Sequence, residues 1–468
     1  MGMSSGVSAQ DSTQAAPSSK AALSASQPHV IVVVVDDFGL GDIGCYGGTL
    51  QPTPAMDQMA REGIRWTHFY SASCICSPSR AALVTGQYSG RHKITSYLQT
   101  RAGNKACGQA DFLSPSAPSL ARIFKSMGYR TCHLGKWHLG GGRDVTSAPK
   151  FSTYGYDHAH GTWESPEPAA ALGKQYPPWS EQLEPGQVHR SDRTRWLVDQ
   201  AIEYVLKDST RPALITLWLD DTHVPFRPSA EQLETVGGGN PATVKDRSEK
   251  DRYRAVLANL DVQIGRLTEA IRKHSLAEKT LVVLMGDNGP APTFDQVRTG
   301  GLRGSKLSLY EGGIRVPLIV WQPGRIPAGV VDETTVFTAI DLLPTLMTYA
   351  GGEQGRQQLA TNSLKLDGRE MSGAWMGTPG SGVRANFWEY GRKTEAFAFP
   401  KDPKNRSPFL AMREGPWKLL VNFDGKEAEL YQLDLDPYET TNRAPEEAER
   451  VERMRVKLLG WFKEVYPH

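Results

Sequence analysis

The chain has 468 residues, of which 39% are hydrophobic and 22% are charged. An apolar share of this size supports a large core and excludes disorder over the whole chain. The 53 Lys and Arg residues nearly balance the 51 Asp and Glu residues, which gives a net charge of +2. Proteins that bind duplex nucleic acid usually carry a strong basic excess, so we expect no nucleic-acid partner.

The start of the chain and its longest apolar run bear on targeting. Residues 1–27 are rich in Ser, Ala and Gln and show no periodicity, which predicts a disordered leader. They lack the basic start and the apolar stretch of a signal peptide. The longest apolar run, residues 30–35, is far shorter than the ~20 residues that cross a bilayer, so we expect no membrane span.

Order is expected to begin at residues 29–35, where a continuous β-branched run predicts a central parallel strand that is buried on both faces. Helices are expected at 194–206 and around 256–271, where apolar residues recur at helical spacing. Further strands are expected at 213–219, 280–285 and 317–321. This alternation predicts a doubly wound, mostly parallel α/β sheet over residues 28–380.

The pattern changes near residue 381. Short strand candidates at 409–412, 417–421 and 429–433 precede a last helix over about 445–465. We therefore expect a smaller C-terminal α+β domain over residues 381–468.

Oxygen-bearing side chains follow two of the expected strands. Asp36 and Asp37 end the first strand, and Asp287 and Asn288 follow the strand at 280–285. In open α/β sheets, ligands bind at the C-terminal ends of the strands. A single Asp there is more often a cap or turn residue, but recurrence at one edge favours a cation site. Three carboxylates and one amide suit Ca²⁺ or Mg²⁺ and not a thiolate-seeking metal.

Residues 76–86 carry the most specific motif, Cys-Ser-Pro-Ser-Arg-Ala-Ala-Leu-Val-Thr-Gly. It resembles the signature of the type I, arylsulfatase-like sulfatases, Cys-x-Pro-Ser-Arg followed by a short apolar helix and Thr-Gly. Only Cys76 fits the register, because Cys74 is followed two residues later by another cysteine. Six further segments resemble landmarks of that family in the same order: 36–39, 135–140, 287–289, 303–317, 341–346 and 430–437.

The resemblance implies an alkaline-phosphatase-like fold and an enzyme that hydrolyses organic sulfate esters, of a carbohydrate or an aryl alcohol, to the alcohol and inorganic sulfate. It implies that a formylglycine-generating or sulfatase-maturating enzyme oxidises Cys76 to formylglycine, whose hydrate is the nucleophile. It also implies one bound Ca²⁺, with the ligands Asp36, Asp37, Cys76, Asp287 and Asn288.

The same resemblance implies a role for each cationic residue of the motifs. Charge builds on the sulfate and on the leaving oxygen during cleavage, so catalysis needs cationic groups and a proton donor. Arg80 lies four residues after Cys76, returns to the same face of a helix and holds the nucleophile. Lys136 and Lys306 neutralise the sulfate oxygens.

Proton transfers are implied for three residues. His223 is the expected general acid for the leaving oxygen, together with Lys306. His138 assists release of sulfate by removing a proton from the hydrate. Asp287 takes the proton of the attacking hydroxyl.

Candidate substrate residues lie in and beyond a polar, aromatic stretch at 154–164. This composition suits stacking on a sugar ring, or equally ordinary connecting structure. His160 and Trp163 in this stretch and Arg303 further on are the candidates. None of them discriminates a carbohydrate sulfate from an aryl sulfate.

Two alternatives to the sulfatase hypothesis stay open. One is a phosphodiesterase or phosphonate monoester hydrolase of the same superfamily, which shares the metal loops. The other is a protein that binds sulfated glycans and keeps Cys76 unconverted. The family resemblance also implies export to the periplasm or the extracellular space.

Overall fold

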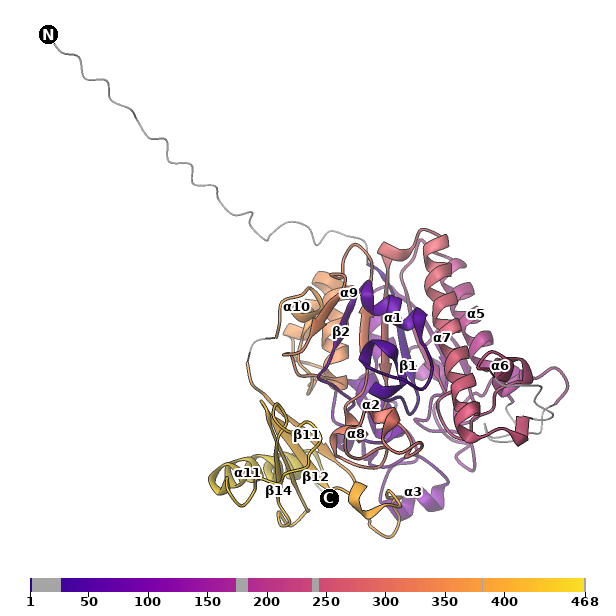
Figure 1. The fold of residues 1–468 in the computed structure, drawn as a ribbon. Helices are drawn as coiled ribbons and strands as arrows, with labels where there is room; N and C mark the ends of the chain where they lie inside the picture. The colour runs from indigo at the N-terminus through magenta and orange to yellow at the C-terminus, as the bar shows by residue number, and fades with distance from the viewer. Residues whose placement is uncertain (2–26, 174–183, 238–243, 381, 467–468) are drawn as a thin grey trace.

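The computed structural model describes residue 1 and residues 27–173, 184–237, 244–380 and 382–466. The expected leader lies outside these residues, apart from its first and last residue. The centre of the molecule is an eight-stranded sheet with the order β5-β4-β6-β1-β7-β8-β2-β9 (Figure 1). Its strands are β1 (His29–Val35), β2 (Ile64–Trp66), β4 (Arg130–Gly135), β5 (His158–Gly161), β6 (Ala213–Leu219), β7 (Thr280–Gly286), β8 (Leu318–Trp321) and β9 (Val330–Asp332).

The middle of the sheet is parallel. β1 pairs in parallel with β6 and β7, and β4 pairs in parallel with β5 and β6. β8 runs antiparallel to β7 and β2. The sheet is therefore mostly parallel, as predicted.

Helices cover both faces of the sheet, because alternate side chains of each strand point to opposite faces. Val30, Val32 and Val34 of β1 belong to one core, and Ile31, Val33 and Val35 belong to the other. The first core packs under α2 (Cys76–Thr85), α4 (Leu120–Ser126) and α9 (Leu342–Ala360). The second packs under α1 (Pro54–Arg61), α5 (Arg190–Leu206) and α7 (Glu249–Lys273), and Figure 1 shows α5 and α7 side by side. This arrangement confirms the doubly wound α/β class.

Capping side chains explain where the two expected helices begin. α5 begins at Arg190, four residues before the expected start, because the His189 side chain accepts a hydrogen bond from Ser191 N. α7 begins after Ser248, whose side chain accepts from Asp251 N. Both caps satisfy backbone donors that lack a partner inside the helix.

A four-stranded antiparallel sheet, β11-β12-β13-β14, forms the C-terminal part, shown in yellow in Figure 1. One face packs on the last helix, and the other packs on the large unit through Trp388, whose Nε1 donates to Ser71 O at 2.8 Å. The elements are β11 (Ala385–Glu389), β12 (Leu410–Glu414), β13 (Trp417–Val421), β14 (Glu429–Gln432) and α11 (Ala448–Val465). β11 was not among the expected strands.

The remaining elements are short: β3 (Phe69–Tyr70), α3 (Arg101–Cys107), α6 (Ala230–Glu234), α8 (Glu311–Ile314), β10 (Phe337–Thr338) and α10 (Ser372–Trp375). Among the helices of the described ranges, none is both long enough and apolar enough to span a bilayer.

Candidate active site

Seven of the expected catalytic and metal-binding residues converge at the C-terminal edge of the large sheet. Each one follows a strand or begins a helix: Asp36 and Asp37 after β1, Lys136 after β4, His223 after β6, Asp287 and Asn288 after β7, and Cys76 at the first position of α2. The topology therefore brings together segments that are far apart in the sequence, as expected for ligand sites in open α/β sheets.

Cys76 lies at the centre of this group and is buried. Its Sγ lies 3.4 Å from Asp36 Oδ1 and 3.7 Å from Lys136 Nζ. Burial, and then the charge of Asp36, raise the pKa of the Cys76 thiol well above its usual range. Because the thiolate is the reactive form of cysteine, the unmodified residue is a poor nucleophile here.

Arg80 is held rigidly beneath Cys76. Its Nε and Nη2 lie 2.8 and 2.7 Å from Asp287 Oδ2, and its Nη1 donates to Lys136 O at 2.6 Å. The guanidinium also stacks on Trp218, 5.0 Å from the ring centroid. No freedom remains for this side chain to move into solvent.

Two lysines pair with the two carboxylates of the first loop. Lys136 Nζ lies 2.6 Å from Asp36 Oδ2, and Lys306 Nζ lies 2.7 Å from Asp37 Oδ1. Burial lowers the pKa of each lysine, but the neighbouring carboxylates outweigh it, so both pKa values are raised and both amines stay charged. The site therefore presents fixed positive charge beside Cys76.

The donor set fits a hard divalent cation. Asp36 and Asp37 each offer a carboxylate oxygen within 4.8 Å of Cys76 Sγ and a His223 ring nitrogen, whereas Asp287, an expected ligand, is not in this group and pairs through Oδ2 with Arg80. Asn288 Nδ2 donates to Asp37 Oδ1, while its buried Oδ1 finds no partner among the described residues. Burial, and then Asp36, raise the pKa of Asp287 to about 7. An orphaned amide oxygen beside crowded carboxylates is what a cation such as Ca²⁺ stabilises.

His223 faces the same cluster. Its Nδ1 donates to Val224 O at 2.6 Å, which leaves Nε2 as the atom that lies 3.8 Å from Asp37 Oδ2. Burial, and then Lys306, lower the pKa of His223 to about 4. The imidazole is therefore neutral, and a general-acid role requires it to gain a proton when a negatively charged substrate arrives.

His138 contacts Leu98 and Glu164. Its Nε2 donates to Leu98 O at 3.0 Å and lies 3.3 Å from Glu164 Oε2. Its buried Nδ1 finds no partner in the described part of the chain. His138 adopts a φ of +55°, and Asp37 a φ of +54°. Strained backbone of this kind concentrates at functional sites.

A search of family models matches residues 28–352 to the Sulfatase family. The chain belongs to this family. Its activity class is accordingly that of the sulfuric ester hydrolases.

Individual relatives are also sulfatases. The sulfatase is 30% identical over 411 residues to arylsulfatase G of Mus musculus, covering 78% of this chain and 71% of that protein. It is 29% identical over 350 residues to N-acetylgalactosamine-6-sulfatase of Canis lupus familiaris, covering 69% of this chain and 62% of that protein. The crystal structure of Ps i-CgsB in complex with k-i-k-neocarrahexaose superposes with a TM-score of 0.73 at 23% identity, covering 93% of each chain, and shows the same fold.

The three candidate substrate residues make contacts with other parts of the protein. Trp163 stacks with Arg143, which pairs with Glu164 beside His138. His160 points toward α5 and contacts the Trp196 ring. Neither contact involves the cluster around Cys76.

Arg303 of the sulfatase joins the large unit to the C-terminal sheet. Its guanidinium lies 3.7 Å from the centroid of the Tyr310 ring, and its Nη1 donates to Tyr431 Oη and Glu439 O. The Arg303 side chain stays partly exposed, and its role toward a substrate stays a prediction. In the stretch 154–164, the Tyr154 and Tyr156 rings are buried around Trp137, so these two rings are part of the core.

The sequence reasoning missed Arg298, which holds the first acidic loop in place. Its Nη2 donates to Asp37 O at 2.6 Å, its Nε donates to Asp42 Oδ1 at 3.0 Å, and its guanidinium stacks 4.2 Å from the Tyr253 ring centroid. Nothing in the sequence distinguishes Arg298 from an arginine that is exposed to solvent.

A buried ion cluster supports the segment that carries Lys306. Lys418 Nζ of β13 lies 2.9 Å from Glu311 Oε1 and 2.9 Å from Glu439 Oε1. Glu311 begins α8, which closes the loop after Lys306, and Gly289 N donates to Gly313 O at the end of that loop. The C-terminal sheet thus braces both the lysine loop and the loop of Asp287 and Asn288.

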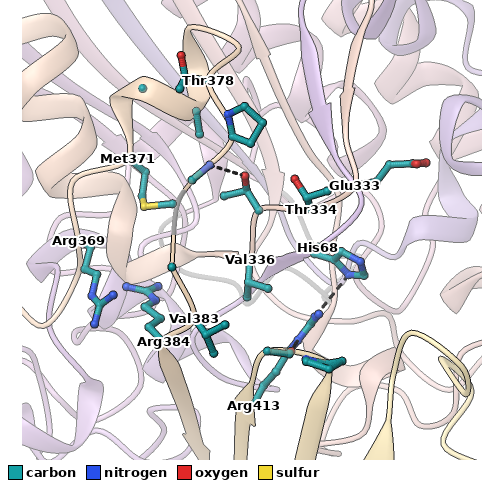
Figure 2. A pocket seen from close by; sticks show the side chains of 18 of the residues that line it. His68, Glu333, Thr334, Val336, Arg369, Met371, Thr378, Val383, Arg384 and Arg413 are labelled. Atoms are coloured by element: carbon teal, nitrogen blue, oxygen red, sulfur yellow. Dashed lines mark hydrogen bonds between the residues drawn. The ribbon is translucent and has the colours of Figure 1, made fainter.

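A separate cavity of about 660 Å³ lies where the large unit meets the C-terminal sheet, and Figure 2 shows its lining. Arg384 pairs there with Asp341, and Arg413 Nη1 lies 3.4 Å from His68 Nδ1. These two cations already have partners within the protein, and no described lining residue belongs to the cluster around Cys76.

Proposed function

We propose that this sulfatase hydrolyses sulfate esters of glycans to the free hydroxyl and inorganic sulfate, with residue 76 converted from cysteine to formylglycine. The observation that carries the proposal is the place of Cys76. It lies buried between Asp36 and Lys136, where its thiol is held protonated and where cationic groups surround the reacting position.

Formylglycine hydrate at residue 76 would supply one hydroxyl to form a bond to sulfur as the ester S–O bond breaks, and a second hydroxyl whose lost proton would allow C=O to form as the C–O bond to sulfate breaks. Asp36, Asp37, Asp287 and Asn288 would hold one Ca²⁺, which acts as a Lewis acid on a sulfate oxygen when bound. The orphaned Asn288 Oδ1 supports this assignment.

The protein's own cations bind and orient the sulfate. Lys136 is buried and Lys306 is partly buried, and carboxylates raise the pKa of both amines, so they would neutralise charge that develops on sulfate oxygens. Arg80, fixed by Asp287 and Lys136 O, keeps the side chain of residue 76 in place.

Two histidines would move protons. His223 presents Nε2 to the reacting position and would protonate the leaving oxygen, since a bound sulfate favours the charged imidazole. His138 has an unpartnered Nδ1 and would accept the proton that accompanies sulfate release.

The glycan substrate rests on relatives: one is an N-acetylgalactosamine-6-sulfatase, and one solved structure holds a neocarrahexaose. The proposal also keeps residues 28–380 as the catalytic domain and 381–468 as a C-terminal domain. It includes a formylglycine-generating or sulfatase-maturating partner, and export to the periplasm or extracellular space, which cell fractionation tests.

The test compares turnover of sulfated monosaccharides with turnover of a phosphodiester and a phosphonate monoester, using protein co-expressed with a maturation enzyme. We expect the highest kcat/KM on a sulfated sugar. Cys76→Ala should lose turnover while Cys74→Ala, a neighbouring buried thiol outside the cluster, retains it. Faster turnover of a phosphorus ester would contradict the proposal, as would sulfate turnover by Cys76→Ala.

A further inference from the structure

Two histidines on the edge strand of the large sheet form a pair that the catalytic site does not use. β5 is the outermost strand and pairs only with β4 in the described sheet. His158 and His160 are two residues apart, so their side chains stand on the same face of the strand. Their Nε2 atoms lie 3.0 Å apart. His158 is exposed and His160 is half-buried, so solvent ions reach both rings.

Helix α5 orients the two rings. The His158 ring stacks on Tyr204, with centroids 6.0 Å apart and planes 15° apart. The His160 ring packs edge-on against Trp196 at 4.9 Å, and the Gln200 side chain hydrogen-bonds to it. The ring contacts restrict both imidazoles, and a hydrogen bond such as that between Gln200 and His160 is the kind of outer contact that orients a metal-binding histidine. The pair is therefore arranged before any ligand arrives.

The spacing of the two nitrogens matches adjacent positions around one metal ion. Nitrogen ligands lie about 2.0–2.1 Å from such an ion, so two nitrogens 3.0 Å apart subtend roughly 90–100° at it. Angles near 90° belong to square-planar, tetragonal and octahedral spheres, which Cu²⁺ and Ni²⁺ prefer for nitrogen ligands.

The protonation state is also suitable. Burial lowers the pKa of both imidazoles, and Lys207 lowers that of His158 further, whereas Glu203 opposes the shift at both. Both rings are then neutral near pH 7, the form that binds metals. The Glu203 carboxylate adds negative charge beside the pair.

We propose that His158 and His160 form a chelating site for a late first-row divalent metal ion, with Cu²⁺ bound most tightly. The order follows the general rise in affinity from Mn²⁺ to Cu²⁺ for nitrogen sites. This site is distinct in place and chemistry from the oxygen-rich cluster around Asp36 and Asp37, which suits a hard cation.

The test titrates CuCl₂ into the untagged full chain in the presence of saturating Ca²⁺, followed by calorimetry and by electron paramagnetic resonance. His158→Ala and His160→Ala should each weaken Cu²⁺ binding by at least ~10-fold, equal to about 1.4 kcal/mol. The resonance spectrum of the parent protein should show coupling to two imidazole nitrogens. His274→Ala, at an exposed histidine that follows α7, is the control and should bind as the parent does.

A second readout is the melting temperature, since an ion that binds only the folded state raises it. Cu²⁺ should raise the melting temperature of the parent more than that of either variant, while the metal-free proteins melt alike. Equal Cu²⁺ affinity in the parent and both variants would overturn the proposal, and so would a spectrum without imidazole coupling. In either case, the 3.0 Å contact is only a hydrogen bond between two neutral histidines.

Discussion

Replacement of Lys418 by methionine tests whether the C-terminal sheet braces the catalytic loops. Lys418, Glu311 and Glu439 are all fully buried, and the amine lies 2.9 Å from a carboxylate oxygen of each glutamate. Glu439 Oε2 also accepts a hydrogen bond from Glu311 N at 2.7 Å. The three residues therefore form one unit that links β13 to α8.

The expected loss of stability is large because Lys418→Met removes the amine that both buried carboxylates contact, and Glu311 then keeps only the more distant Arg315, 3.7 Å away, as an ion-pair partner. Removing one partner of a buried ion pair typically costs about 3–5 kcal/mol. Burial already raises the pKa of Glu439 to about 7 in the intact cluster. We expect Lys418→Met to lower the free energy of unfolding by about 3–5 kcal/mol. The double variant Lys418→Met/Glu439→Gln should recover part of this loss, because Glu439→Gln removes one buried charge and keeps an acceptor for Glu311 N.

Urea denaturation measures the effect. Lys426→Met is the matched control, since Lys426 is exposed and its nearest carboxylate, Asp424, is 3.5 Å away at the surface. It should change the free energy of unfolding by less than about 1 kcal/mol. If Lys418→Met proved as stable as Lys426→Met, the buried cluster would not contribute as argued, and the link from the C-terminal sheet to the Lys306 loop would lose its basis.

Three further predictions follow from the site and its surroundings. Arg80→Lys should lower kcat by about 10²-fold or more in steady-state assays, because lysine cannot bridge Asp287 and Lys136 O at once; a change below tenfold would contradict the positioning role. Chelation should abolish turnover and Ca²⁺ should restore it better than Zn²⁺, whereas rescue by Zn²⁺ alone would contradict an oxygen-ligand site. Burial raises the pKa of Glu389 to about 8, so the folded state holds a proton that the unfolded state releases, and stability should fall as pH rises from about 4.5 to 8. Glu389→Gln should flatten this fall in melting experiments across that pH range, and an unchanged slope would place the titration elsewhere.

Strands with continuous apolar runs in the large sheet were predictable from the sequence, whereas β4 was not. β1, β6 and β7 are buried along their whole length, so their sequences read as β-branched or aliphatic runs. β4 carries His133 and Thr131 in the same buried setting. His133 Nδ1 lies 2.9 Å from Thr216 Oγ1, a partner on β6 that no local pattern reveals.

Some residues of the candidate site could be predicted from the sequence and others could not. The acidic residues lie at strand ends, and Cys76 and Arg80 lie in one short motif at the start of α2, so these residues could be identified from the sequence. The supporting residues could not be, because Arg298 and Lys418 act on loops that are distant in sequence, and their type is common on surfaces. The substrate role of Arg303 stays a prediction, and the stacking of its guanidinium on Tyr310 could not be read from its motif.

The central claim is that an oxidised side chain at residue 76 performs the hydrolysis. Trypsin releases residues 66–80 as one peptide that contains both Cys74 and Cys76, so Cys74 serves as an internal control in its fragment spectrum. We predict an aldehyde at residue 76 and a thiol at residue 74, with specific activity proportional to the converted fraction across preparations. Full sulfatase activity in a preparation that retains the thiol at residue 76 would contradict the account.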